Sequence, residues 1–272
     1  MRHMRVCIIT LMKMRCAIML LLALICSCQS TQELNSTEAQ SLVVLLAHPD
    51  DETWVSGTLA KLADRGVRVF PVYATSGDAG RDHSGQGLSG AELARVREKE
   101  AIAASSILGL EAPMFLRFPD GKLANFYHQL IEIFESIVSQ KNPIAVMSFI
   151  RGGITDNRDH KTVNKLVAGE FNENSIYFAL SDTRADILSR SVERFGLGYP
   201  IAVPVDDSEI SIRVDVSSYA RRRVSAMSIY TSQFSPTMIS AFSDFVERST
   251  VEELVILDGV ELPSNLLYLL NL

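Results

Sequence analysis

Short apolar runs alternate with helix-like segments along this chain, and this alternation restricts its possible folds most. The clearest apolar runs are residues 41–47, 67–74, 114–118 and 144–150. The helix-like segments between them are residues 53–64, 91–108 and 126–140. Strands that alternate with helices are typical of βαβ units, whose crossovers are right-handed in nearly all cases. We therefore predict an α/β fold: a Rossmann-like, mainly parallel sheet with helices on both faces.

The rest of the chain adds later elements and one long loop. Two further strands and two closing helices are predicted at residues 201–205, 210–216, 218–230 and 235–248. Pro71 lacks a backbone N–H, so the strand that contains it should not be paired along its whole length. Residues 75–90 are rich in Gly, Ser and Asp. Long loops of this kind are usually functional or disordered.

Polar side chains that ligate metals or move protons follow the first apolar run directly. They are His48, Asp50, Asp51 and Glu52. Ligands bind at such a strand-to-helix junction in an open α/β sheet. Like-charged carboxylates repel one another, so a bound divalent cation would relieve the cost of this cluster. The alternative is that Asp50 and Asp51 cap the next helix, which would leave His48 without a role.

A second junction of the same kind follows the apolar run at residues 144–150. It carries Asp159 and His160 ahead of a helical segment that we expect to begin at Lys161. Parallel strands end at one edge of a sheet, so both junctions should meet there. His48, Asp51 and His160 would then surround one cation. Two nitrogens, one carboxylate and an open position suit catalytic zinc, and other divalent ions accept the same ligands.

The length and charge of the chain narrow the function further. It has 272 residues and a net charge of −6. Such a length suits one domain, which we predict at residues 41–272. The sequence has no large basic block, so charge gives no support for a nucleic-acid partner.

The first 28 residues resemble an export signal. Basic residues precede residues 16–26, an apolar stretch shorter than the roughly 20 residues of a membrane span. Cys28 follows small residues as in a bacterial lipoprotein signal, and a polar tether is predicted at residues 29–40. A lipid on Cys28 would hold the protein at a membrane surface. Because Cys26 is unusual within such a signal, ordinary signal cleavage is the alternative.

The cysteine distribution agrees with export without disulfides. All four cysteines lie in the first 28 residues, so the predicted domain has none to pair. We expect a protein of the bacterial cell envelope, exported and lipid-anchored at the periplasmic or outer surface.

Several motifs along the chain resemble those of one enzyme family. They are Ala-His-Pro-Asp-Asp-Glu at 47–52, Thr-Ser-Gly-Asp-Ala-Gly at 75–80, Phe-Pro-Asp-Gly at 118–121 and Ser-Gln-Phe at 232–234. In this order they resemble the LmbE/PIG-L-type zinc-dependent deacetylases of N-acetylglucosaminyl compounds. The resemblance implies an LmbE-like fold. It also implies removal of an N-acetyl or N-acyl group from an amino-sugar or glycan-type substrate.

The resemblance assigns roles to residues at the two junctions. It implies that His48, Asp51 and His160 bind Zn²⁺ and that Asp50 is the general base. Asp159 would orient a neighbouring group, as carboxylates around metal sites commonly do.

Substrate contacts are implied at two further positions. Arg97 and Asp120 match residues that hold the sugar in family members. For Arg97 the alternative is a surface pair with Glu100 on the same helix. Asp78 and Glu52 are expected to support the metal site or the loop.

One position departs from the family pattern. Family members commonly have a histidine three residues before the second metal histidine, where this chain has Asn157. An amide can donate to an oxyanion but does not deliver a proton near neutral pH. Losing such a group typically costs ~10²–10³ in rate. His83 is a candidate substitute, and its alternative is an ordinary solvated loop residue.

The sequence is also compatible with two other functions. The chain could be a deacylase of a different amide substrate with the same site. It could also be a non-catalytic or weakly catalytic carbohydrate-binding lipoprotein, because Asn157 replaces the histidine.

Overall fold

The computed structural model describes residues 40–198 and 203–270. The predicted export signal, Cys28 and nearly all of the predicted tether lie outside these residues. The described residues form one compact unit. Within the described part, no helix has the length and apolar character needed to cross a membrane.

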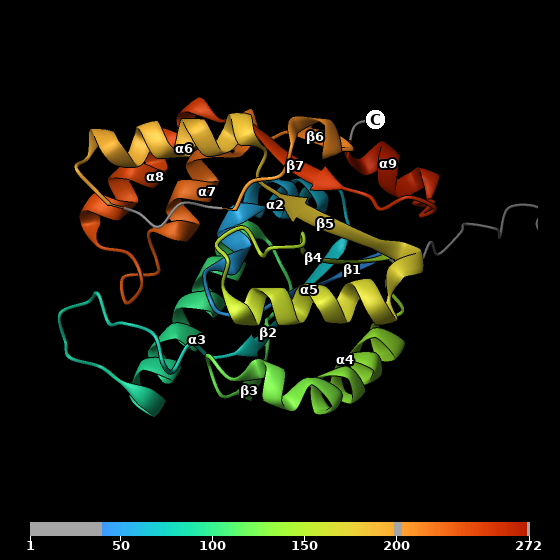
Figure 1. The fold of residues 1–272 in the computed structure, drawn as a ribbon, viewed down its shortest axis with the longest axis horizontal. Helices are drawn as coiled ribbons and strands as arrows, with labels where there is room; N and C mark the ends of the chain where they lie inside the picture. The colour runs from blue at the N-terminus through green and yellow to red at the C-terminus, as the bar shows by residue number, and fades with distance from the viewer. Residues whose placement is uncertain (1–39, 199–202, 271–272) are drawn as a thin grey trace, which may run out of the picture. The chain divides into compact units, whose positions relative to one another are not determined.

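The described residues form a seven-stranded sheet in the order β3-β2-β1-β4-β5-β7-β6 (Figure 1). The strands are β1 (Ser41–Leu46), β2 (Arg68–Thr75), β3 (Met114–Phe118), β4 (Ala145–Phe149), β5 (Ser175–Ala179), β6 (Ile212–Asp215) and β7 (Val251–Val255). Strands β1 to β5 pair in parallel. Strand β7 runs antiparallel to β5 and β6. The predicted mainly parallel α/β sheet is therefore confirmed.

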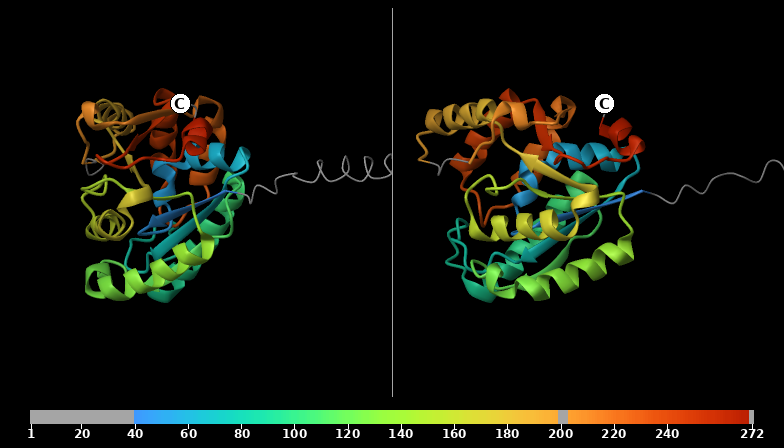
Figure 2. Two further views of the ribbon diagram at one scale, coloured as in Figure 1. Left: turned by 90° about the vertical axis from the view of Figure 1, so that its right-hand side faces the viewer. Right: turned by 45° about the vertical axis from the view of Figure 1, so that its right-hand side comes forward.

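Helices surround this sheet (Figure 2). They are α2 (Ser56–Asp64), α3 (Gly90–Leu108), α4 (Tyr127–Lys141), α5 (Arg158–Glu170), α6 (Asp182–Arg194), α7 (Ala220–Met227), α8 (Pro236–Arg248) and α9 (Ser264–Leu270). Right-handed crossovers put α2 and α3 on one face of the sheet and α4 and α5 on the other, because the chain reverses its direction across the sheet after β3.

The reversal of strand order lies between β1 and β4. The chain moves from β1 outward to β2 and β3, then returns to β4 on the other side of β1. Loops on either side of such a reversal diverge and leave a crevice at the carboxyl ends of the strands. His48 follows β1, and His160 lies in the first turn of α5 after β4. The topology therefore opens a crevice between the two junctions.

The position of β1 within the sheet explains why its sequence is apolar. Every residue from Ser41 to Leu46 is buried, because helices cover both faces of the sheet and strands flank both edges of β1. In β2, pairing with β1 begins at Arg68, whereas pairing with β3 begins only at Val72. Pro71 precedes the second ladder, so the expectation of incomplete pairing is confirmed.

Two predicted helix starts are wrong. Residues 53–64 do not form one helix, because a short 3-10 helix, η1 (Asp51–Trp54), precedes α2. Helix α5 begins at Arg158 rather than Lys161, because the Asn157 side chain caps it by accepting the N–H of Asp159.

Other elements were missed or only partly predicted. Strands β5 and β7 and helices α6 and α9 were not predicted from the sequence. In the predicted strand at 201–205, residues 201–202 lie outside the described part, and Val205 makes a single bridge with Ser181.

Candidate active site

The first junction fixes the Asp51 carboxylate by backbone donors. One oxygen of Asp51 accepts the N–H of Ala47 at 2.9 Å and that of His48 at 2.6 Å. Asp50, just before η1, has a left-handed backbone with φ of 98°. Such a conformation costs a non-glycine residue about 1–3 kcal/mol and is typical of functional sites. The Asp51 carboxylate is therefore held by the backbone of its own junction.

The second junction fixes one nitrogen of His160 and leaves the other available. Nδ1 of His160 lies 2.8 Å from the Gly153 carbonyl oxygen, to which it donates. The imidazole ring stacks on Phe149, with ring centroids 4.1 Å apart. A side chain at Gly153 would overlap the Cβ of His160, so this close approach requires glycine. The lone pair of His160 therefore lies on Nε2, which faces the first junction.

The structure brings His48, Asp51 and His160 together. His48 Nδ1 lies 3.2 Å from His160 Nε2, and an Asp51 oxygen lies 3.1 Å from the same Nε2. Ligands about 2.1 Å from a tetrahedral metal ion lie about 3.4 Å from each other. The spacing and the two facing nitrogens fit a divalent cation. Burial alone would raise the pKa of Asp51, but His160 and His48 lower it below its usual value.

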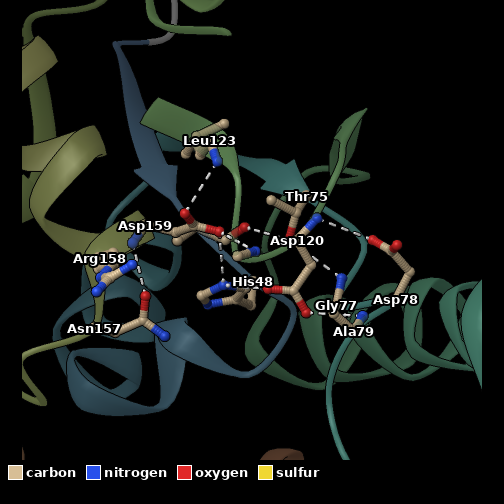
Figure 3. Close-up of polar contacts among 12 residues, drawn as sticks. His48, Thr75, Gly77, Asp78, Ala79, Asp120, Leu123, Asn157, Arg158 and Asp159 are labelled. Atoms are coloured by element: carbon tan, nitrogen blue, oxygen red, sulfur yellow. Dashed lines mark hydrogen bonds and ion pairs between the residues drawn. The ribbon is translucent and has the colours of Figure 1, made fainter. Parts of the chain in front are cut away.

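The other nitrogen of His48 faces two carboxylates. Its Nε2 lies 3.1 Å from an Asp120 oxygen and 3.6 Å from an Asp159 oxygen (Figure 3). Histidines that bind metals commonly donate their second N–H to a carboxylate in this way. Burial lowers the pKa of His48. The contacts with Asp120, Asp159 and Asp51 raise it by a larger amount, so the pKa of His48 is well above its ordinary value.

Asp159 and Asn157 hold the surrounding backbone (Figure 3). The Asp159 carboxylate accepts the N–H of Gly121 at 2.7 Å and that of Leu123 at 3.1 Å. It therefore orients the turn that carries Asp120. The Asn157 oxygen accepts the Asp159 N–H at 2.7 Å, so this oxygen is already engaged as a helix cap.

A cavity of about 490 Å³ contains this cluster. All but one of the predicted site residues line it; those that do are His48, Asp50, Asp51, Arg97, Asp120, Asn157 and His160. The exception is Asp159, which does not line the cavity and is only 1% exposed. His83 also lines the cavity, and its backbone N–H donates to Ser232.

Arg97 is buried and holds the Gly-rich loop. Its guanidinium donates to the carbonyls of Gly77 at 2.7 Å and Arg81 at 3.1 Å. Glu100 instead accepts the N–H of Ser232 at 2.8 Å. The alternative of an Arg97–Glu100 pair on the surface is therefore wrong.

Glu52 and Asp78 have supporting contacts. Glu52 is fully buried and accepts the hydroxyls of Tyr73 at 2.8 Å and Tyr230 at 2.5 Å. Asp78 accepts the N–H of Asp120 at 3.2 Å. Gln233, within the Ser-Gln-Phe motif, donates to the carbonyl of Pro49.

Sequence reasoning missed the apolar part of the cavity wall. It comes from Trp54, Met227, Phe234 and one face of α8. The only signal was the helical spacing of apolar residues on α8, and such spacing is found in any helix packed on a core.

Comparisons with known proteins agree with this geometry. The family model described as PIG-L: GlcNAc-PI de-N-acetylase matches residues 43–169. A 1D-myo-inositol 2-acetamido-2-deoxy-alpha-D-glucopyranoside deacetylase of Actinosynnema mirum is 26% identical over 234 residues, covering 72% of this chain and 82% of that protein. A Bacillus cereus protein named probable N-acetyl-alpha-D-glucosaminyl L-malate deacetylase 2 is 29% identical over 111 residues, covering 40% of this chain. That match spans 50% of the Bacillus protein.

A solved structure shares the fold. The N,N'-diacetylchitobiose deacetylase from Pyrococcus horikoshii superposes with a TM-score of 0.60 at 20% identity, covering 85% of this chain and 86% of that one. The motifs, the sheet and the matched segment lead to one conclusion. Residues 43–169 of this chain are a PIG-L (LmbE-like) de-N-acetylase domain.

Proposed function

We propose that this chain is a metal-dependent hydrolase that removes an N-acetyl or N-acyl group from an amino-sugar substrate, with Zn²⁺ as the first candidate metal. The observation that carries the proposal is the meeting of His48, Asp51 and His160 in one cavity, with Asp50 beside them. The named activities of the relatives support the same reaction class.

The metal would be held by His48 Nδ1, His160 Nε2 and the Asp51 oxygen that accepts no backbone N–H. When bound, Zn²⁺ supplies a Lewis acid and lowers the pKa of a water from 15.7 toward about 7. The Gly153 carbonyl holds the tautomer of His160, and Asp120 holds that of His48.

Asp50 is proposed as the base that takes a proton from the attacking water. Unlike Asp51, which accepts the backbone N–H groups of Ala47 and His48, Asp50 has its carboxylate at the wall of the cavity. Burial raises the pKa of Asp50 well above its ordinary value, Asp51 raises it further, and Arg97 lowers it. A raised pKa suits a carboxylate that must accept and then release a proton near neutral pH.

Asn157 and Asp159 are proposed in different roles. The Asn157 oxygen caps α5, so its amide N–H groups are what remain to donate to a developing oxyanion. Asp159 is a positioning residue, because it holds the Asp120 turn and faces His48. Arg97 shapes the sugar-facing loop through Gly77 and Arg81.

The test is acetate release from N-acetylglucosaminyl compounds by the purified protein. We expect activity that a chelator abolishes and added Zn²⁺ restores. Asp50→Asn should keep the metal and lose turnover, whereas Asp51→Asn should lose both. Activity that resists the chelator would contradict the proposal.

A non-catalytic carbohydrate-binding protein is the second candidate, because Asn157 replaces the family histidine. Sugar binding and stoichiometric metal without any hydrolysis across a panel of N-acyl sugars would favour it. Hydrolysis of amides that lack a sugar would instead favour a deacylase of another substrate class.

We also propose export and lipid anchoring at Cys28, on the sequence of the first 28 residues alone. Mass spectrometry of the mature N-terminus tests this. A diacylated Cys28 is expected, and an unmodified N-terminus after ordinary cleavage would contradict the anchor.

A further inference from the structure

The cavity has two chemically different walls. Near the proposed sugar site it is lined by Gly80, Arg81, Arg97 and Asp120. Elsewhere it is lined by apolar side chains, among them Trp54, Phe234, Met238, Phe242, Phe245 and Val246. Gly80 and Arg81 lie in the loop before α3, and four of the apolar residues lie on α8. Figure 1 shows this loop and α8 both at the left of the view. A small acetylated sugar gives the second wall little to contact.

Helix α8 builds most of the apolar wall. Met238, Phe242, Phe245 and Val246 stand at i, i+4, i+7 and i+8, which places them on one face of a helix. The aromatic rings continue beyond the helix. Phe242 lies 6.3 Å from the ring of Trp54 and 5.8 Å from that of Phe234, between centroids.

This wall carries no net charge. Arg223 also lines the cavity, but it forms an ion pair in which its Nε lies 3.0 Å from Oε1 of Glu252. Glu252 is also held by the backbone N–H groups of Gly57 and Thr58, so the buried pair is neutral as a whole. A neutral, aromatic wall favours an apolar group rather than an anion.

We propose that the wall of Trp54, Phe234 and α8 is a subsite for an apolar group of the substrate, which is either a long N-acyl chain or an apolar aglycone. This inference rests on the proposed function, which fixes where the amide bond of the substrate lies in the cavity. Trp54, Phe234 and Met238 are only partly buried, so their surface is available to such a group. Each methylene buried there is expected to tighten binding by about fourfold.

Trp54 is the only tryptophan of the chain, so the tryptophan fluorescence reports on this wall alone. Binding can therefore be measured without turnover. Trp54 fluorescence would report binding to the Zn²⁺-loaded Asp50→Asn variant, which is expected not to hydrolyse the ligand. One series lengthens the N-acyl group of glucosamine from acetyl to octanoyl. The other keeps N-acetyl and lengthens the glycoside from methyl to octyl. The series whose Kd falls by about fourfold per methylene over its first members identifies the apolar group.

The matched variants are neighbours on α8. Met238→Glu places a charge on the wall, and it should still fold because Glu three residues after the Ser235 cap suits a helix start. It should weaken octyl or octanoyl ligands at least tenfold and change N-acetyl ligands less than twofold. Thr237→Glu, at an exposed position, should change neither. Met238→Ala is the milder variant if Met238→Glu does not fold.

Two results would overturn the subsite. One is a Kd that does not change with chain length in either series. The other is equal loss of affinity in Met238→Glu and Thr237→Glu. Both are separate from the proposed function, because acetate release by the unmodified protein would still be observed if the hydrolase assignment holds and only the apolar subsite fails.

Discussion

The Nε2 atom of His48 lies 3.1 Å from a carboxylate oxygen of Asp120, while Nδ1 of the same ring faces His160. One imidazole therefore connects the candidate metal site to the turn that follows β3. The family resemblance implies that Asp120 contacts the sugar. Its contact with His48 gives it a second task, which is to hold the metal ligand in its tautomer and orientation.

Asp120→Asn is expected to weaken Zn²⁺ binding by about 10- to 100-fold, because the amide no longer favours the N–H on His48 Nε2. At saturating Zn²⁺, kcat should fall more than KM rises. Metal titration against a competing chelator and steady-state kinetics measure the two effects. Asp78→Asn is the control, since it loosens the same turn without touching His48. A change in KM alone would indicate that Asp120 acts on the sugar only.

Gly80→Ala is expected to displace the Gly-rich loop. An added Cβ would overlap the guanidinium of Arg97, which bonds to the carbonyls of Gly77 and Arg81. Misplacing a substrate-positioning group by about 1 Å can cost about 100-fold in rate, so kcat/KM should fall 10- to 100-fold with unchanged thermal stability.

The control for this loop is Gly85→Asn. Gly85 has φ of 77° and open space around it, and Asn accepts that conformation better than other residues. Near-normal kcat/KM is expected. Equal losses in both variants would mean that the loop tolerates no substitution and that the Arg97 contact is not the cause.

The site residues that could be predicted are those whose positions follow from a short segment of the chain. His48 and Asp51 stand in one short junction, and the position of His160 after a parallel strand predicted their meeting. The contact between Asp120 and His48 could not be predicted, because it depends on how the turn after β3 packs against the turn after β1. No spacing within the sequence encodes that packing.

Strand β7 shows why part of the fold was missed. Its sequence, Val-Glu-Glu-Leu-Val, carries two adjacent carboxylates and does not resemble a buried strand. Both are buried because Arg223 and Arg184 lie beside them. Those arginines come from α7 and α6, far away in the sequence. Long-range ion pairs of this kind override the local apolar pattern.

Asn157 offers a way to separate stability from catalysis. Asn157→Ala removes the cap of α5 and should lower the free energy of unfolding by about 1 kcal/mol. Asn157→Asp keeps the cap but replaces an amide donor by a carboxylate, so stability should be retained while kcat falls. Urea unfolding and kinetics of both variants test this. Full activity in Asn157→Asp would show that the amide does not stabilise the transition state.

The buried carboxyl group of Glu52 should make the stability of the metal-free protein depend on pH. Burial raises the pKa of Glu52 to about 7 from an ordinary value of 4.5, although the hydroxyls of Tyr230 and Tyr73 oppose the shift. The folded state therefore favours the neutral acid. Its contribution to stability is complete below pH 4.5 and is lost as the pH rises through 7. The change in pKa from 4.5 to about 7 corresponds to about 3 kcal/mol of stability.

Glu52→Gln should remove this dependence, because the amide remains neutral at every pH. The free energy of unfolding of the chelator-treated protein, measured in urea from pH 4.5 to 8, should fall relative to that of Glu52→Gln by about 3 kcal/mol. Parallel curves for the two proteins would mean that Glu52 is ionised in the folded state throughout this range. The two tyrosine hydroxyls would then stabilise its charge more than burial opposes it.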